Sequence, residues 1–126
     1  MEIKPRMIGD VTILDCSGKI TLIPGDPVNS GVCILRRAVR AELERGTKKI
    51  ILNLAEVNYI DSSAIGELVS SHTTITNQAG QLKLLNLTQK IQELLQITRL
   101  LTVFSVCDNE AMALASFETS QQEVRS

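Results

Sequence analysis

Residues 50–68 read IILNLAEVNYIDSSAIGEL, and they place an apolar run ahead of an aspartate and two serines. Residues 50–54 are the continuous apolar segment that a strand covered on both faces requires. After Asp61, the apolar residues Ile65, Leu68 and Val69 recur at the spacing of one helix face. The stretch therefore predicts a central strand, an amphipathic helix, and the junction Asp61-Ser62-Ser63 between them.

Upstream of this stretch, the sequence predicts strands and then a helix. Residues 11–16 and 20–23 are short, apolar and rich in β-branched side chains, with Ser17-Gly18-Lys19 between them as a turn or bulge. We interpret them as two strand segments. The sequence Pro24-Gly25-Asp26-Pro27 then interrupts regular structure. A helix is expected after it, because apolar residues recur at helical spacing at Val32, Leu35, Val39 and Leu43. Gly46 is the expected end of this helix.

Downstream, the same alternation continues. The helix after the junction is expected to end at Gly80, and residues 82–85 predict the next strand. Thr88 is a candidate cap for a short helix, residues 103–107 predict a further strand, and Asp108-Asn109 is expected to cap a last helix. Strands that alternate with helices at these short intervals indicate parallel neighbours joined by right-handed crossovers.

Length and composition favour one domain that needs neither nucleic acid nor a membrane. A chain of 126 residues with 44% hydrophobic content can form one core, expected over residues 11–117, with a frayed polar tail at 118–126. Its 13 basic and 14 acidic residues give no general attraction to nucleic acid or anionic lipid. No apolar stretch is long enough to cross a bilayer. The chain has three widely spaced cysteines, Cys16, Cys33 and Cys107. An odd number at such spacing suits reduced core thiols, and it therefore favours the cytoplasm.

The sequence lacks the motifs of self-contained catalysis. It has no Gly-x-Ser-x-Gly elbow, no glycine-rich phosphate loop and no clustered metal ligands, so we expect no enzyme activity, no cofactor and no metal. The single histidine, His72, falls on the apolar stripe of the second helix and is interpreted as a packed residue. Asp61 does not fit a response-regulator phosphoacceptor, because no acidic pair accompanies it to hold magnesium.

Two interpretations of the Asp61-Ser62-Ser63 junction follow from its residues. All three are good helix-capping residues, so the junction can be a cap and nothing more. Neither serine has a glutamate three positions later, since Glu67 lies five after Ser62 and four after Ser63. One hydroxyl can therefore cap while the other stays available, and a helix N-terminus tolerates a phosphate.

At these residues the chain resembles the STAS domain of anti-sigma factor antagonists. The resemblance rests on the strand at 50–54, the segment Asn58 to Ser63 with the small residue Ala64 after it, and Gly80-Gln81-Leu82-Lys83-Leu84. It implies an α/β STAS fold, with a small mixed, mostly parallel sheet of four to five strands and about four helices, largely on one side. It also implies that Ser62 is the phosphoacceptor, that Asp61 positions its hydroxyl, and that Ser63 mainly caps the helix.

The resemblance further implies the partners. These are an anti-sigma factor with a GHKL-type serine kinase site and a PP2C-type phosphatase that removes the phosphate. The expected contact residues are Asn58, Asp61, Ser62, Ser63, Gly25 and Asp26. Two departures affect this surface: Ala64 stands where many members have glycine, and the loop at residues 23–30 is longer than the usual turn. Gly25 and Asp26 also fit the simpler interpretation of turn residues.

Three functions of different classes remain open at this point. The first is an anti-sigma factor antagonist, whose unphosphorylated form binds the anti-sigma factor and so releases the sigma factor for transcription. The second is a STAS subunit of a transporter or signalling scaffold, which docks to another protein without any phosphate. The third is a small-molecule enzyme that its motifs do not reveal.

Overall fold

The computed structural model describes the backbone of residues 1–125 and the side chains of residues 1–117. It contains one five-stranded sheet in the order β1-β2-β3-β4-β5. The strands are β1 (Glu2–Ile8), β2 (Val11–Ile20), β3 (Lys49–Ile60), β4 (Gln81–Leu85) and β5 (Ser105–Cys107). Strand β1 runs antiparallel to β2, and every other neighbouring pair is parallel. The mixed, mostly parallel α/β sheet that the sequence predicted is therefore confirmed.

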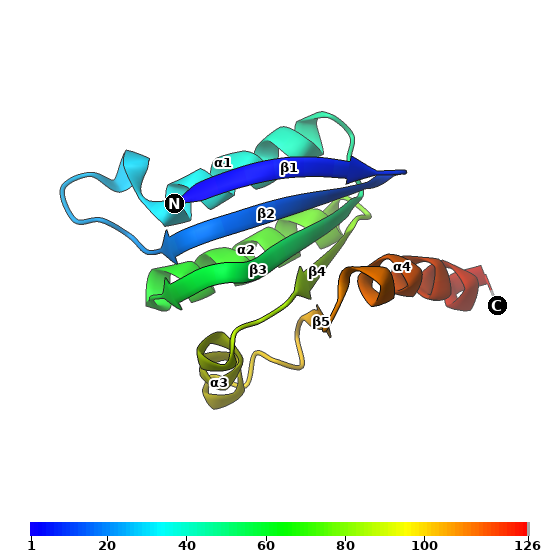
Figure 1. The fold of residues 1–126 in the computed structure, drawn as a ribbon. Coiled ribbons are helices and arrows are strands. Elements are labelled where there is room, and N and C mark those ends of the chain that lie inside the picture. Colours follow the sequence, from blue (N-terminus) through cyan, green and yellow to red (C-terminus); the bar gives the residue numbers. More distant parts are fainter. Residues whose placement is uncertain (126) are drawn as a thin grey trace.

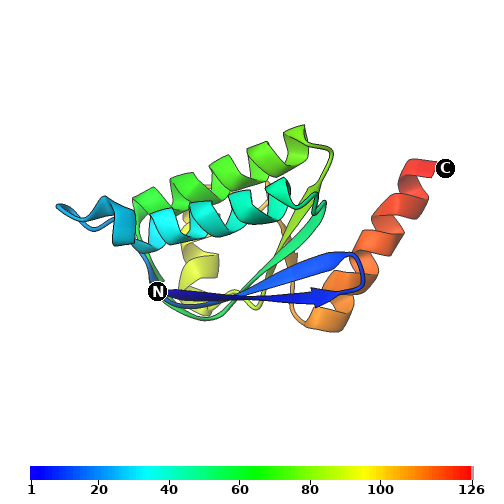
Figure 2. The same ribbon diagram turned by 90° about the horizontal axis from the view of Figure 1, so that it is seen from above.

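The helices lie unequally on the two faces of this sheet. They are α1 (Gly31–Glu44), α2 (Ser62–Asn77), α3 (Gln89–Ile97), α4 (Glu110–Arg125) and the short 3-10 helix η1 (Pro27–Asn29). Figure 1 shows α1 and α2 side by side behind the strands, and Figure 2 shows both on one side of the sheet. Helix α4 packs on the other face, where its Ala113 and Phe117 join a second apolar cluster.

Strand β3 supplies both faces of the core. Its residues Ile50, Leu52 and Leu54 point into the larger cluster with α1, α2 and α3, whereas Ile51 points into the smaller one with α4. All four are fully buried. The prediction of a strand covered on both faces is thus correct, although β3 extends to Ile60, well beyond the apolar run that revealed it.

Strand β1 does not appear in the sequence prediction. Its residues are mostly exposed, because it is an edge strand that lies beside only β2. Its sequence, EIKPRMI, mixes charges and a proline and therefore lacks an apolar run. Exposure on an edge strand removes the hydrophobic pattern on which strand prediction depends.

The predicted strand at residues 20–23 is wrong. Residues 11–20 form one continuous strand with irregular register between Asp15 and Ser17 and between Gly18 and Lys19, so the anticipated bulge is present. After Ile20 the chain leaves the sheet, because Thr21 O accepts the Val32 N–H and the Leu22 N–H bonds to the Asp61 carboxylate. Strand β5 also begins at Ser105, two residues later than predicted.

The last helix contains most of the predicted tail. Helix α4 continues through Arg125, so the backbone of residues 118–125 is helical. Their side chains and all of Ser126 lie outside the described residues, and the fraying expected there stays a prediction. Asn109 Oδ1 accepts the Met112 N–H at 2.8 Å, which identifies Asn109 as the residue that caps this helix.

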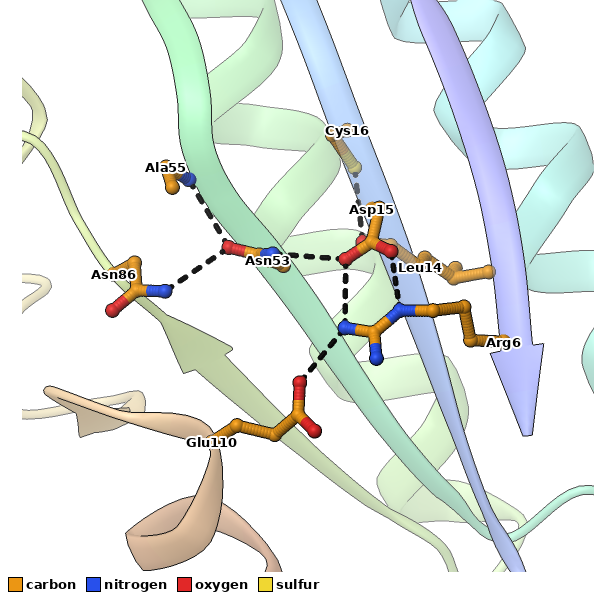
Figure 3. A network of polar contacts seen from close by, with 8 residues as sticks. All are labelled: Arg6, Leu14, Asp15, Cys16, Asn53, Ala55, Asn86 and Glu110. Carbon is orange, nitrogen blue, oxygen red and sulfur yellow. Dashed lines mark hydrogen bonds and ion pairs between the residues drawn. The ribbon is translucent and has the colours of Figure 1, made fainter. Parts of the chain in front are cut away.

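A polar network crosses the sheet on the face that carries α4 (Figure 3). The Arg6 guanidinium bonds to both carboxylate oxygens of Asp15 and to Glu110, and Asn53 donates to Asp15. Asn86 in turn donates to Asn53. The Arg6 guanidinium holds the pKa of the Asp15 carboxyl below its usual range. The network connects β1, β2, β3 and α4, and so attaches the edge strand to the opposite end of the chain.

The cysteines are not uniformly core residues. Cys16 and Cys107 are buried in strands, but Cys33 lies on α1 and is only half-buried, so the expectation of a core thiol is wrong there. Burial raises the pKa of the Cys16 thiol to about 12. His72 packs edge-on against the Phe104 ring, 5.5 Å between centroids, as expected for a packed residue.

Leu68→Ala tests the packing of α2 on β3. Leu68 is fully buried in the larger cluster, and the substitution should lower the free energy of unfolding by about 2–5 kcal/mol. Ile97→Ala is the control, because Ile97 is 78% exposed and its truncation should change stability by no more than about 0.5 kcal/mol. Urea unfolding measures both, and equal losses in the two variants would contradict the packing described here.

Candidate functional site

The junction between β3 and α2 is built by Asp61. Its backbone is extended, with φ −108° and ψ −177°, and its Oδ1 accepts the Ala64 N–H at 2.8 Å. Asp61 is therefore the N-cap, and Ser62 and Ser63 are the first two residues of the helix. The prediction that Ser63 caps the helix is wrong, because β3 pairing carries the extended chain as far as Asp61.

The second oxygen of Asp61 bonds to a different element. Its Oδ2 accepts the Leu22 N–H at 3.0 Å, while the Asp61 N–H donates to Ile20 O at 3.3 Å. Residue 22 belongs to the loop at residues 21–30, which connects β2 to α1 and includes η1. One carboxylate thus joins the start of α2 to this β2–α1 loop.

Ser62 is exposed and Ser63 is half-buried. Within the part of the chain that the structure describes, neither hydroxyl makes a side-chain hydrogen bond. Ser62 lies in the first turn of a 16-residue helix, where unpaired N–H groups and the positive end of the helix dipole favour an anion. The Ser62 side chain is thus exposed at a helix end that favours negative charge.

Exposed apolar side chains surround this end of the molecule. Leu22 and Ile23 are each 42% exposed, Val28 is 60% exposed and Tyr59 is 40% exposed. The Lys90 ammonium lies 5.1 Å from the centre of the Tyr59 ring. Sequence reasoning missed this apolar group, because it assigned residues 20–23 to a strand. Two apolar residues directly before Pro24-Gly25 were the available signal.

The other predicted contact residues lie at the same end of the sheet (Figure 1). Gly25 has φ +87° in the β2–α1 loop, and the Asp26 carboxylate accepts both bonds from Asn29 Nδ2. Asn58 is exposed near the end of β3. The structure therefore brings Gly25, Asp26 and Asn58 to the end that carries Ser62. Their contact with a partner stays a prediction.

Helix α2 continues the exposed surface away from Ser62. Gly66 and Ser70 follow at intervals of four residues and are exposed on the same side of the helix. A Cβ atom added at Gly66 would meet nothing within 4 Å. This side of α2 therefore carries small, uncharged residues at 62, 66 and 70, and it is open to close approach at Gly66.

Two features are absent from the part of the chain that the structure describes. No three His, Cys, Asp or Glu side chains in this part of the chain lie together as a metal site would need. No helix in it is long and apolar enough to cross a membrane.

The STAS domain family model matches residues 27–113. The BtrV protein of Bordetella bronchiseptica, whose name places it among anti-sigma factor antagonists, is 24% identical over 86 residues, which cover 68% of this chain and 74% of BtrV. A solved Thermotoga maritima structure, described as an anti-sigma factor antagonist, has a TM-score of 0.79 and 23% identity. The match covers 90% of this chain and 92% of the Thermotoga chain.

Two further solved structures share the fold. The phosphorylated form of SpoIIAA, a Bacillus cell fate determinant, has a TM-score of 0.68 and 18% identity, and the match covers 92% of this chain and 99% of that one. The murine anion transporter Slc26a9 has a TM-score of 0.70 and 17% identity, and the match covers 90% of this chain but 18% of the transporter. At these identities the likeness shows the fold alone.

The capping assignment can be tested by stability. Asp61→Ala removes the acceptors for both Ala64 N–H and Leu22 N–H, and loss of the cap alone should lower the free energy of unfolding by about 1 kcal/mol, within a range of roughly 0.5–2 kcal/mol. Ser63→Ala, at the second residue of the helix, should change it by less than about 0.5 kcal/mol. Thermal and urea unfolding give both values, and a larger loss for Ser63→Ala would return the capping role to Ser63.

Proposed function

The chain belongs to the STAS domain family, and on that premise we propose that it is an anti-sigma factor antagonist switched by phosphorylation of Ser62. The unphosphorylated form binds an anti-sigma factor of the GHKL serine-kinase type in the cytoplasm and so releases the sigma factor. Phosphorylation ends this binding, and a PP2C-type phosphatase restores it. The names of the relatives support the antagonist role.

One observation carries the proposal. Ser62 presents an exposed hydroxyl at the first residue of α2, directly after the Asp61 cap, and this hydroxyl has no side-chain hydrogen bond to any described residue. A serine that capped the helix would accept a hydrogen bond from a backbone N–H on its hydroxyl oxygen, but here the Asp61 carboxylate accepts that bond. The hydroxyl is thus left for a reaction that another protein performs.

The surroundings of Ser62 favour a protein partner. The exposed apolar residues Leu22, Ile23 and Val28 offer area that is stabilised by removal from water. The uncharged side of α2 at Gly66 and Ser70 lets a partner approach closely. With a net charge of −1, the chain relies on this local complementarity rather than on long-range attraction.

The chemistry of the switch belongs to the kinase. It transfers the γ-phosphoryl group of ATP to Ser62 Oγ, so that an Oγ–P bond forms, the bond to ADP breaks, and the hydroxyl proton passes to a base of the kinase. ATP and magnesium arrive with that enzyme. This chain supplies a substrate residue and a docking surface, and it requires neither a catalytic base nor a cofactor.

The added phosphate acts through charge. It carries about −1.5 to −2 at neutral pH and lies next to the Asp61 carboxylate, in a surface that the partner must desolvate. A loss of roughly 3–4 kcal/mol in binding corresponds to a decrease in affinity on the order of several hundredfold. That decrease is enough to exchange partners, and the fold need not unfold because a helix N-terminus accommodates an anion.

A second function has one observation in its favour. The fold also forms part of the Slc26a9 transporter chain, so a STAS subunit of a transporter or signalling scaffold is the alternative. In that case the same end of the molecule docks to another protein and Ser62 is never phosphorylated. The two functions therefore differ in whether a kinase modifies Ser62.

The phosphorylation switch can be tested with GHKL-type anti-sigma factors from the same organism. Each is incubated with the chain, ATP and magnesium, and the phosphate is located by mass spectrometry. We expect it on Ser62 and expect none on Ser62→Ala, whereas Ser63→Ala should still be modified. Titration calorimetry should show that Ser62→Ala binds the kinase and that Ser62→Asp binds roughly several hundredfold more weakly.

Two results would count against this assignment. Phosphate on Ser63 would show that Ser63, and not Ser62, is the phosphoacceptor, although the proposed antagonist function would still hold. Absence of phosphate and of binding with every such kinase would favour the transporter or scaffold function. The melting temperature of Ser62→Asp should remain close to that of the wild type, which separates lost binding from lost folding.

Gly66→Arg tests the docking surface independently of the phosphate. The new side chain would extend into open space on the exposed side of α2, so the fold should tolerate it, and the partner should clash with it. We expect a decrease in affinity for the anti-sigma factor of at least about tenfold with a nearly unchanged melting temperature. Gly66→Ala is the matched control, because it adds only one methyl group in the same open space and should bind as the wild type does.

A further inference from the structure

We propose that Asp61 is a positioning residue that holds the β2–α1 loop beside Ser62, and that negative charge on Ser62 loosens this loop. The switch would then act on the shape of the docking surface as well as on its charge. The hydrogen bond between Asp61 and the loop is observed in the structure. Its role in regulation rests on the proposed function.

The geometry of the connection is specific. The two oxygens of Asp61 accept from two backbone N–H groups that are far apart in sequence: Oδ1 from Ala64 at 2.8 Å, and Oδ2 from Leu22 at 3.0 Å. A carboxylate accepts on both oxygens and has no proton to donate, so it can serve both groups at once. Serine, threonine or asparagine would also cap the helix, but none offers two such acceptor oxygens.

The β2–α1 loop has few other restraints. Residues 22–29 are all exposed, and η1 has no buried residue. Among the described residues, the other hydrogen bonds of this segment are local, such as Asp26 N to Ile23 O at 3.1 Å and Asn29 Nδ2 to the Asp26 carboxylate. The Leu22–Asp61 bond therefore connects the exposed part of the loop to the body of the protein, and it fixes where Leu22 and Ile23 are presented.

A negative charge on Ser62 acts directly on this connection. Ser62 follows Asp61 in the chain, and an anion there competes for the N–H groups of the first helical turn and repels the carboxylate. Both bonds of Asp61 depend on one planar carboxylate. A rotation that moves it away from Ser62 therefore alters its bond to Leu22 as well.

Amide hydrogen exchange, measured residue by residue by NMR on the full chain, tests the connection without any kinase. Asp61→Asn keeps a good capping residue, but its amide group offers only one acceptor oxygen. We expect the Leu22 N–H to exchange about tenfold faster than in the wild type, because a bond to a charged acceptor is lost. The Leu52 N–H, in the middle of β3, should be unchanged and so reports an intact fold.

Glu56→Gln is the matched control for the loss of a carboxylate. Glu56 is exposed on β3 and takes no part in the connection, so its variant should leave Leu22 exchange at the wild-type rate. A Leu22 rate in Asp61→Asn that equals that of the wild type would overturn the positioning role.

Ser62→Asp and Ser62→Asn separate charge from shape, since they differ in charge at nearly equal size. We expect Ser62→Asp to accelerate Leu22 exchange severalfold more than Ser62→Asn does. In the Asp61→Asn background the two substitutions should give equal rates, because the bond that charge disrupts is already absent. Equal rates in the wild-type background would overturn the coupling. That result would not depend on whether a kinase modifies Ser62, so it is distinguishable from failure of the proposed function.

Discussion

Burial of β3 on both faces is the constraint from which the rest of the structure follows. Because Ile51 and Leu52 are both fully buried on opposite sides of one strand, the sheet needs helices on each side. Pairing with β2 and β4 satisfies the backbone of β3 along its apolar part, and pairing with β2 continues to Ile60. The strand thereby delivers Asp61 to a defined point at the end of the sheet, where α2 begins.

The elements with a strong hydrophobic pattern could be predicted from the sequence, and those without one could not. Helices α1 and α2 and the apolar half of β3 reveal themselves because their buried residues recur at the expected spacing. Strand β1 has no such pattern, since only Ile3 of its residues is partly buried and the strand is held mainly by β2 and the Arg6 network. Leu22 and Ile23 produced the opposite error, because they are apolar yet exposed.

The candidate site was located by its motif, but its internal arrangement was not. Three capping residues in a row leave the cap undetermined, and the choice of Asp61 depends on where the pairing between β2 and β3 stops. The bond from Leu22 N to Asp61 Oδ2 joins residues that are 39 positions apart. Contacts of this kind follow from tertiary structure, and no local pattern in the sequence encodes them.

The two edges of the sheet limit how this protein can associate with others. An exposed edge strand is a template for another chain, and such pairing leads to aggregation or strand exchange. Here one edge is β1, which places Pro5, a residue with no N–H to donate, among charged neighbours, and the other is β5, which has three residues. Neither edge is a good template for a visiting strand. Recognition by backbone pairing of an added strand is therefore disfavoured, which leaves association to contacts between individual side chains.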